Sequence, residues 1–351
     1  MSCAGPLGIK SNYLVVGRAA TGIYVLLRAK FTGREVVVPA NICPAAVYPI
    51  VYSGNKPVFC DVESPSGNVS LQKIKGCITV QTSAVIVPHM YGNPVQGISE
   101  ISRFCAERGI MMIEDCASAM GAEINGVPVG SFGDYAIYST GHAKTLDLGG
   151  GGLIVSDNDL CDVEAVVSAV KSDHALAAIQ ESRFARTYRI FLNTRAPLSC
   201  YPDKHFFSSD FRDMLLVDIS TDRANEIIAS IKSDLSNAVN ERRERQLAFE
   251  QIFDSFDIAS ERYRYGEGAV PWRFSFFVSG KDRQRLADAM LEAALPVSDW
   301  YPAMAELFDD NGEYPTAYNL GRTILNLPLT LSTQRFADAC RLIVKYCKTK
   351  A

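Results

Sequence analysis

The chain has 351 residues, 48% of them hydrophobic and 21% charged, and its formal net charge is −4. This length is sufficient for one large core or two domains, and the near-balanced charge argues against binding to nucleic acid or to a membrane surface. Because the first residues lack a signal-peptide layout and no apolar run approaches the ~18 residues of a membrane span, we expect a soluble cytoplasmic protein. The ten cysteines lack the paired spacing of metal sites, so we expect reduced, mostly buried thiols and no bound metal.

The first half of the chain alternates between strand-like and helical segments. The strand-like segments are EVVVP (35–39), KPVFCDV (56–62), SAVIVP (83–88), IMMIEDC (110–116), DYAIYST (134–140) and GGLIVSD (151–157). Helical spacing occurs between them, at 20–30, 45–54, 70–78 and 97–109. Nearly continuous apolar strands separated by helices are typical of a mostly parallel sheet covered on both faces. The pattern therefore predicts an α/β fold with a large sheet domain.

The pattern changes after about residue 160. A charged amphipathic helix (235–253), a strand (270–280), another helix (282–295) and a terminal helix (332–350) predict a smaller C-terminal α+β domain. We place the large domain at 1–234 and the small domain at 235–351, with an irregular connection at 199–218. The arginine-rich stretch NERRERQ (240–246) is interpreted as a solvated helix face.

Three polar features follow predicted strands, and ligands bind at that edge of open α/β sheets. Gly17 and Arg18, in VVGRAATG, open a helix whose N–H groups and dipole suit a phosphate. Asp115 ends a buried strand, where a carboxylate needs a cationic partner. Lys144 lies in the glycine-rich stretch STGHAKTLDLGGGG, where a lowered pKa would let its amine form a Schiff base. Taken singly, each has an ordinary alternative: a structural glycine, a capping carboxylate and a solvated lysine.

Taken together, these features predict one ligand that carries an aldehyde, a ring nitrogen and a phosphate. Pyridoxal 5′-phosphate (PLP) has all three groups. A carboxylate beside its pyridine nitrogen keeps that nitrogen protonated, so that the ring can accept electrons.

The chain also resembles the DegT-type (sugar aminotransferase) family of fold-type I PLP enzymes. The resemblance extends from Gly17 to the terminal helix, and its clearest segments are 35–70, 84–95, 111–157 and 318–334, in the family's order and spacing. It implies a large PLP-binding domain, a smaller C-terminal domain and a homodimer whose active sites are shared between subunits.

The resemblance implies roles for individual residues. Lys144 is the Schiff-base lysine and proton shuttle, and Asp115 pairs with the pyridine nitrogen. The other implied cofactor-binding residues lie around the phosphate or the ring: Gly17, Arg18, Ala19, Cys43, Ala117, Ser118, Ser139 and, toward a neighbouring subunit's phosphate, Arg212.

The sequence departs from the family pattern at several of these positions. Cys43 stands where an aromatic residue usually stacks on the ring, Ser118 where a glutamine is usual, and Arg18 where a threonine is usual. Family members also carry a longer segment before the phosphate turn, which implies a more open cleft or a different acceptor here. Lys144 and Asp115 match the family pattern, so the departures concern residues that stack on the ring or contact the substrate.

Four further residues are candidates for substrate binding. Arg273, in PWRFSFF, could grip the α-carboxylate of an amino donor, although an outward surface arginine fits the pattern equally well. Trp300 and Tyr301 match a cleft loop of the family and could instead be core residues. His89 follows a strand, where a structural role near the cleft is our main interpretation.

The resemblance favours a PLP-dependent aminotransferase that moves an amino group from an amino acid, glutamate or glutamine, to a keto acceptor. The acceptor it implies is a nucleotide-linked keto-sugar in glycan or antibiotic biosynthesis. Lys144 favours transamination, because relatives with histidine at this position are dehydratases. Two alternatives stay open: a PLP enzyme that acts on a non-sugar ketone or catalyses an elimination, and a regulatory protein that retains the fold with little activity.

Overall fold

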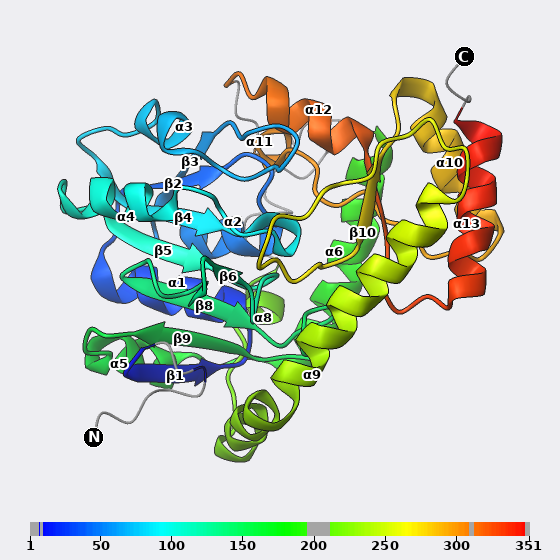
Figure 1. Cartoon of the computed structure of the whole chain (residues 1–351). Coiled ribbons are helices and arrows are strands. Elements are labelled where there is room, and N and C mark those ends of the chain that lie inside the picture. The colour runs from blue at the N-terminus through cyan, green and yellow to red at the C-terminus, as the bar shows by residue number, and fades with distance from the viewer. Residues whose placement is uncertain (1–6, 8–9, 195–210, 309–311, 348–351) are drawn as a thin grey trace.

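The computed structural model describes residues 7, 10–194, 211–308 and 312–347 (Figure 1). Seven strands form one sheet in the order β1-β9-β8-β5-β4-β2-β3. Their bounds are β1 Asn12–Val16, β2 Glu35–Pro39, β3 Lys56–Cys60, β4 Thr82–Pro88, β5 Met111–Asp115, β8 Tyr135–Ser139 and β9 Gly152–Ser156. Only β9 runs antiparallel to its neighbours in this sheet, which confirms the predicted mostly parallel α/β architecture.

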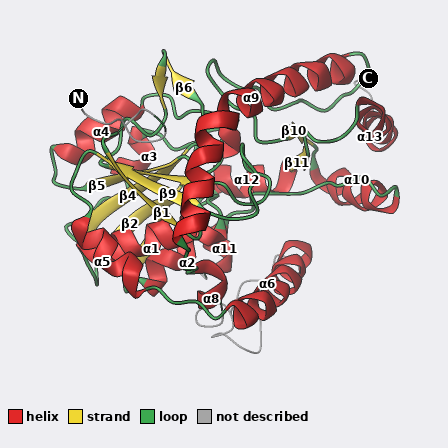
Figure 2. Cartoon of the chain, turned by 90° about the horizontal axis from the view of Figure 1, so that it is seen from below, coloured by secondary structure: helices red, strands yellow, loops and turns green. Residues whose placement is uncertain are grey.

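Helices pack on both faces of this sheet (Figure 2). Those of the first half are α1 Ala19–Lys30, α2 Pro44–Tyr52, α3 Leu71–Lys75, η1 Met90–Gly92, α4 Ile98–Ala106, α5 Cys161–Ala169 and α6 His174–Thr194, and a small hairpin joins β6 Glu123–Ile124 to β7 Val127–Pro128. Strand β8 explains the two-sided cover, because all its residues are buried. Tyr135 and Ile137 belong to one hydrophobic cluster, whereas Ala136 and Tyr138 belong to another.

The second half forms a smaller unit around a two-stranded sheet. Its elements are α8 Arg212–Leu215, α9 Thr221–Asp254, β10 Phe274–Phe277, α10 Gly280–Glu292, α11 Met304–Leu307, α12 Pro315–Thr323, β11 Ile324–Leu327 and α13 Thr333–Tyr346. Strands β10 and β11 pair antiparallel, and their phenylalanines and leucines pack with α10 and α13 in a core of their own. In contrast, α8, α11 and α12 pack against the core of the large sheet.

Helix α9 connects the two cores (Figure 1). Ser220 caps its first turn, since the Ser220 hydroxyl accepts a hydrogen bond from the N–H of Arg223. Its first half buries Ile227 and Ile231 in the cluster over β8 and β9, and its second half buries Phe249 and Phe253 with β10.

The domain boundary that we placed at 235 therefore lies inside a continuous helix, and the division into 1–234 and 235–351 stays a prediction. Of the irregular connection at 199–218, residues 199–210 lie outside the described part of the chain. Among the described residues, no helix combines the length and hydrophobicity needed to cross a membrane.

Candidate active site

A cavity of about 530 Å³ lies at the carboxyl ends of the parallel strands. The segments that follow β2, β4, β5 and β8 supply one wall, and residues next to β10 and before α11 supply another. Parallel strands end at one edge of a sheet, so residues far apart in sequence meet there. The cavity is lined by twelve of the predicted site residues: Arg18, Ala19, Cys43, His89, Asp115, Ala117, Ser118, Ser139, Lys144, Arg273, Trp300 and Tyr301.

Lys144 lies in the glycine-rich loop that follows β8. Its Nζ donates a hydrogen bond to the Ser118 hydroxyl at 3.0 Å. Burial lowers the pKa of the Lys144 ammonium, and the charges of Arg242 and Arg273 lower it further, whereas Asp115 opposes the shift. The fraction of neutral amine at neutral pH is therefore larger than for a solvated lysine.

Asp115 is the last residue of β5 and is buried. Its Oδ1 accepts a hydrogen bond from the N–H of Ala117 at 3.0 Å. Burial raises the pKa of the Asp115 carboxyl, and the Ala117 N–H and the charge of Lys144 offset this only in part. A carboxylate in this environment gains stability from any cationic group that enters the cavity.

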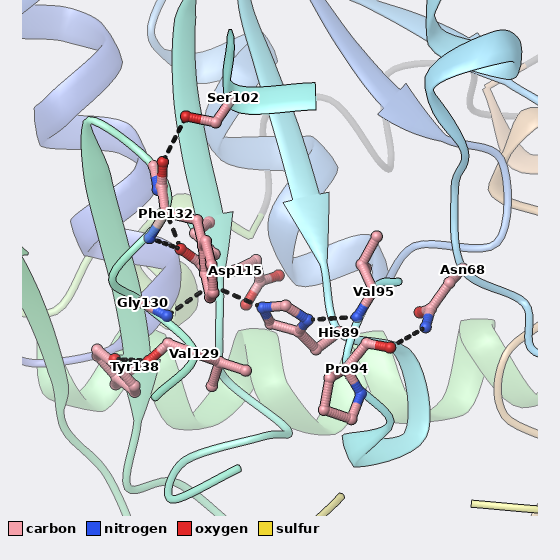
Figure 3. Close-up of polar contacts among 12 residues, drawn as sticks. Asn68, His89, Pro94, Val95, Ser102, Asp115, Val129, Gly130, Phe132 and Tyr138 are labelled. Atoms are coloured by element: carbon pink, nitrogen blue, oxygen red, sulfur yellow. Dashed lines mark hydrogen bonds and ion pairs between the residues drawn. The ribbon is translucent and has the colours of Figure 1, made fainter. Parts of the chain in front are cut away.

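Hydrogen-bond donors surround the carboxylate of the preceding residue, Glu114. Three of the donor residues, His89, Gly130 and Phe132, are labelled in Figure 3. The Glu114 carboxylate accepts hydrogen bonds from the N–H groups of Phe132 at 2.9 Å and Gly133 at 3.1 Å, and also from the N–H of Gly130. His89 Nε2 lies 2.9 Å from the same carboxylate. Burial alone would raise the pKa of Glu114, but the bonds from His89 and the backbone lower it below its usual value.

His89 has both ring nitrogens engaged. Its Nδ1 accepts a hydrogen bond from the N–H of Val95 at 3.0 Å, so Nε2 carries the proton and donates to Glu114 (Figure 3). The ring lines the cavity, but neither nitrogen is free to bind a substrate. This geometry agrees with a supporting role beside the cleft.

The amino end of α1, Ser139 and the glycine-rich loop lie together. Gly17 O accepts a hydrogen bond from the N–H of Gly151 at 2.8 Å, and the Ser139 hydroxyl accepts one from the N–H of Gly141 at 3.2 Å. The free N–H groups of a helix start and a serine hydroxyl suit a phosphate. Arg18 adds a cation, and its Nη2 lies 3.6 Å from a carboxylate oxygen of Glu181 on α6.

Two predicted site residues do not line the cavity. A Cβ on Gly17 would lie 2.3 Å from Val217 O, so the glycine permits close packing of two backbones rather than ligand contact. Arg212 donates to the Tyr24 hydroxyl at 3.0 Å. Its predicted contact with a neighbouring subunit stays a prediction.

Aromatic side chains form the wall contributed by the smaller unit. Tyr301 stacks on Trp272 with ring centroids 5.4 Å apart, and Trp300 packs edge-on against Tyr301 at 5.2 Å. The Arg273 guanidinium lies over the Trp272 ring at 4.5 Å and donates to the Ser298 hydroxyl at 3.0 Å. The buried Nε of Arg273 has no hydrogen-bond partner among the described residues.

On the opposite wall, Cys43 begins α2 and carries a neutral thiol at neutral pH, because burial raises its pKa to about 11. A thiol is smaller than an aromatic ring, so stacking on a planar ligand is weaker at this position.

Sequence reasoning missed several cavity residues. Tyr91, Trp272 and Glu181 line the cavity, and none of them was predicted as a site residue. The interpretation of 240–246 as a solvated face was wrong for Arg242 and Arg243, whose guanidinium groups donate to backbone carbonyls. The available signal was weak, because these arginines stand in a run of charged residues that is typical of an exposed helix.

Comparison with known proteins identifies the family of the chain. Residues 7–190 match the DegT/DnrJ/EryC1/StrS aminotransferase family. The chain belongs to this family. The resemblance inferred from its motifs is thereby confirmed.

Relatives of the chain include named sugar-modifying enzymes. It is 41% identical over 128 residues to a GDP-perosamine synthase of Vibrio cholerae, an alignment that covers 36% of this chain and 35% of that protein. It is 28% identical over 326 residues to a dTDP-4-dehydro-2,3,6-trideoxy-D-glucose 4-aminotransferase of Saccharopolyspora spinosa, covering 90% of this chain and 78% of that protein. The chain therefore aligns with only about a third of the first relative's length.

Solved structures share the fold. The aminotransferase TlmJ from Streptoalloteichus hindustanus superposes with a TM-score of 0.74 at 21% identity, covering 96% of this chain and 86% of that one. An E. coli GDP-4-keto-6-deoxy-D-mannose-3-dehydratase, described with bound hydrated PLP, superposes with a TM-score of 0.71 at 17% identity, covering 96% of this chain and 88% of that one. At these identities, the superpositions establish the fold alone.

Proposed function

We propose that this chain is a PLP-dependent aminotransferase that transfers an amino group from glutamate or glutamine to a nucleotide-linked keto-sugar, and that it works as a cytoplasmic homodimer. The observation that carries the proposal is the meeting of Lys144 and Asp115 in one cavity, although Asp115 ends β5 and Lys144 lies in the loop after β8. Family membership and the named activities of the relatives support the same reaction class.

The residues of the cavity fit PLP. Lys144 offers an amine of lowered pKa, which suits covalent attachment to an aldehyde. Asp115 offers a buried carboxylate for the protonated pyridine nitrogen. Ser139, Arg18 and the N–H of Ala19 at the start of α1 would hold the phosphate.

Other cavity residues would orient the ring. Cys43 and Ala117 would lie on its faces, and Ser118, which already accepts a hydrogen bond from Lys144, would lie near its phenol oxygen. When bound, the cofactor supplies a ring that accepts electrons from the substrate α-carbon. Lys144 would then take the proton from that carbon and later return one, as a general base and acid.

The wall formed by the smaller unit supports an anionic amino donor. Within the part of the chain that the structure describes, the buried Nε of Arg273 and the buried Nε1 of the neighbouring Trp272 have no hydrogen-bond partner. A donor carboxylate would satisfy these N–H groups and the guanidinium charge. Trp300 and Tyr301 would cover the substrate from the side.

A spectroscopic half-reaction tests the proposal. We expect the purified chain to take up PLP with visible absorbance, to lose that absorbance when glutamate or glutamine is added, and to regain it with a keto-sugar acceptor. Lys144→Ala should abolish the covalent uptake, because no other lysine was predicted or observed to line the cavity among the described residues. A wild-type chain that takes up no PLP would overturn the proposal.

Product analysis separates the alternatives. Release of 2-oxoglutarate in proportion to the aminated product supports transamination. Release of ammonia without an aminated product would indicate elimination instead, and turnover of simple ketones alone would replace the keto-sugar with a non-sugar acceptor.

A further inference from the structure

Arg242, on the helix α9, connects two loops that border the cavity. Its Nη1 donates to the carbonyl oxygens of Trp272 at 2.9 Å and Pro271 at 3.3 Å. Its Nη2 donates to the carbonyl of Ala143 at 3.4 Å and to the carbonyl of Lys144 itself. The planar guanidinium group can serve several acceptors at once, which a lysine ammonium in the same place would do less well.

The backbone immediately before Lys144 needs such support. Ala143 has φ of +61°, a left-handed conformation that costs an alanine about 1 kcal/mol. Both polar groups of Ala143 are held: its N–H donates to Asp147 Oδ2 at 2.8 Å, and its carbonyl accepts from Arg242. Asp147 belongs to the loop, whereas Arg242 comes from another part of the molecule and holds the carbonyls of Ala143 and Lys144. Farther along the same loop, Arg223 of α9 donates to the carbonyl of Leu148.

We propose that Arg242 is a positioning residue that holds the left-handed turn at Ala143 and the carbonyl of Lys144, and fixes both relative to the cavity wall at Trp272. The proposal rests on the proposed role of Lys144 as the cofactor-attaching lysine. Without Arg242, the amine at the end of this side chain would lose its set distance from Asp115, and attachment and proton transfer would slow.

Arg242 also contributes its charge. Burial lowers the pKa of Lys144. Among the charged and titratable groups around it, Asp115 raises that pKa, as does Cys43 when it is ionised, whereas Arg242 and Arg273 lower it. Removal of the Arg242 charge should therefore raise the pKa of the Lys144 ammonium, and a lysine at the same position should leave it nearly unchanged.

The set of hydrogen bonds from Arg242 to the carbonyls around Lys144 and Trp272 is called the clamp below. It can be tested on the cofactor-free chain by hydrogen–deuterium exchange of the amides in 141–149. We expect Arg242→Gln and Arg242→Lys to increase exchange by about tenfold, because both lose the forked contacts. Arg243→Gln is the matched control, since Arg243 donates to the carbonyls of Ala269 and Gly268 and not to the lysine loop. Equal exchange in wild type and both Arg242 variants would overturn the proposal.

The pKa of the Lys144 amine can be followed in the same proteins. They are incubated with PLP at a series of pH values, and the covalent adduct is trapped with borohydride. We expect the pH of half-maximal labelling to rise in Arg242→Gln, to stay near the wild-type value in Arg242→Lys, and to be unaffected in Arg243→Gln. Adding Ala143→Gly to Arg242→Gln should restore part of the exchange protection, since glycine adopts the left-handed turn without strain. If the pH of half-maximal labelling is unchanged in Arg242→Gln, the claim that the Arg242 charge lowers the pKa of Lys144 is contradicted.

The two readouts separate this inference from the proposed function. Failure of the wild-type chain to bind PLP would end the proposed function, while the exchange data would still test the clamp. Normal PLP uptake with unchanged exchange in both Arg242 variants would end the clamp and leave the proposed function standing.

Discussion

Two neighbouring carboxylates at the end of β5 lie in opposite environments. Glu114 points to a closed pocket, where His89 and three backbone N–H groups satisfy it and its pKa is lowered. Asp115 lines the cavity, and its carboxylate accepts a hydrogen bond from the backbone N–H of Ala117. Its pKa is raised. The alternation of a strand separates the two residues onto different faces.

The difference teaches how to distinguish a structural ion from a functional one. The pocket of Glu114 is complete without a ligand. Gly130 contributes to that completeness, because a Cβ there would lie 1.8 Å from the Tyr138 hydroxyl, and only glycine lets the turn approach. Asp115 lacks a matching set of donors, so a cationic ligand is what would complete its environment.

The largest expected effect is on catalysis at Asp115. Asp115→Asn should lower kcat/KM for the amino donor by about 10²–10³-fold, because the pyridine nitrogen loses its anionic partner. Stability should change by less than about 1 kcal/mol, since the site contains few satisfied bonds to break. Steady-state kinetics together with urea unfolding checks both parts. An Asp115→Asn enzyme with wild-type turnover would remove the functional half of the comparison.

Glu114→Gln should have the opposite effect, with a large loss of stability and little loss of PLP uptake. The amide loses the charge and directs its NH₂ group toward backbone N–H donors, so we expect unfolding to cost about 2–4 kcal/mol less than in wild type. The part of the protein that remains folded should still take up PLP. Chemical denaturation measures the loss, with Asp115→Asn as the matched control. A loss below about 0.5 kcal/mol would contradict a structural role for this carboxylate.

Local sequence patterns were sufficient to predict the cavity site that contains Asp115. Asp115 ends an apolar strand and Lys144 follows another, and the rule that ligands bind at strand ends predicts that the two residues share one site. Ser139 was implied only by the resemblance to the family. The mostly parallel sheet was predictable for the same reason, because each strand is a short continuous apolar run.

Tertiary packing decided what the sequence could not predict. The first turns of α9 are polar, so the sequence pattern placed the helix start near 235 rather than at Thr221. The signals for the earlier start were a capping serine, Ser220, and the i, i+4 spacing of Ile227 and Ile231. Arg242 stands in a charged run, and its contacts depend on loops 98 and 30 residues away in the chain. A single charged helix face does not reveal which of its arginines will be covered.

The smallest expected effect is on the pH dependence of stability in the cofactor-free chain. Glu114 has a lowered folded pKa, so its contribution is present above the unfolded value of about 4.3 and is lost as pH falls through the folded pKa. Asp115 has a raised folded pKa, so its contribution is complete below about 3.9 and is lost as pH rises through the folded pKa. The contributions of the two residues to the free energy of unfolding therefore change with pH in opposite directions. Each changes by about 1.4 kcal/mol in total per unit of pKa shift.

Urea unfolding between pH 3.5 and 7 measures these slopes. Relative to wild type, Asp115→Asn should become more stable as pH rises from about 4, because it removes a desolvated charge. The deficit of Glu114→Gln should shrink as pH falls below about 4, because wild type then loses the same contribution. For each variant, the stability difference from wild type is plotted against pH. Slopes of equal sign would mean that both carboxylates experience the same environment, and the distinction between the completed pocket of Glu114 and the open cavity at Asp115 would fail.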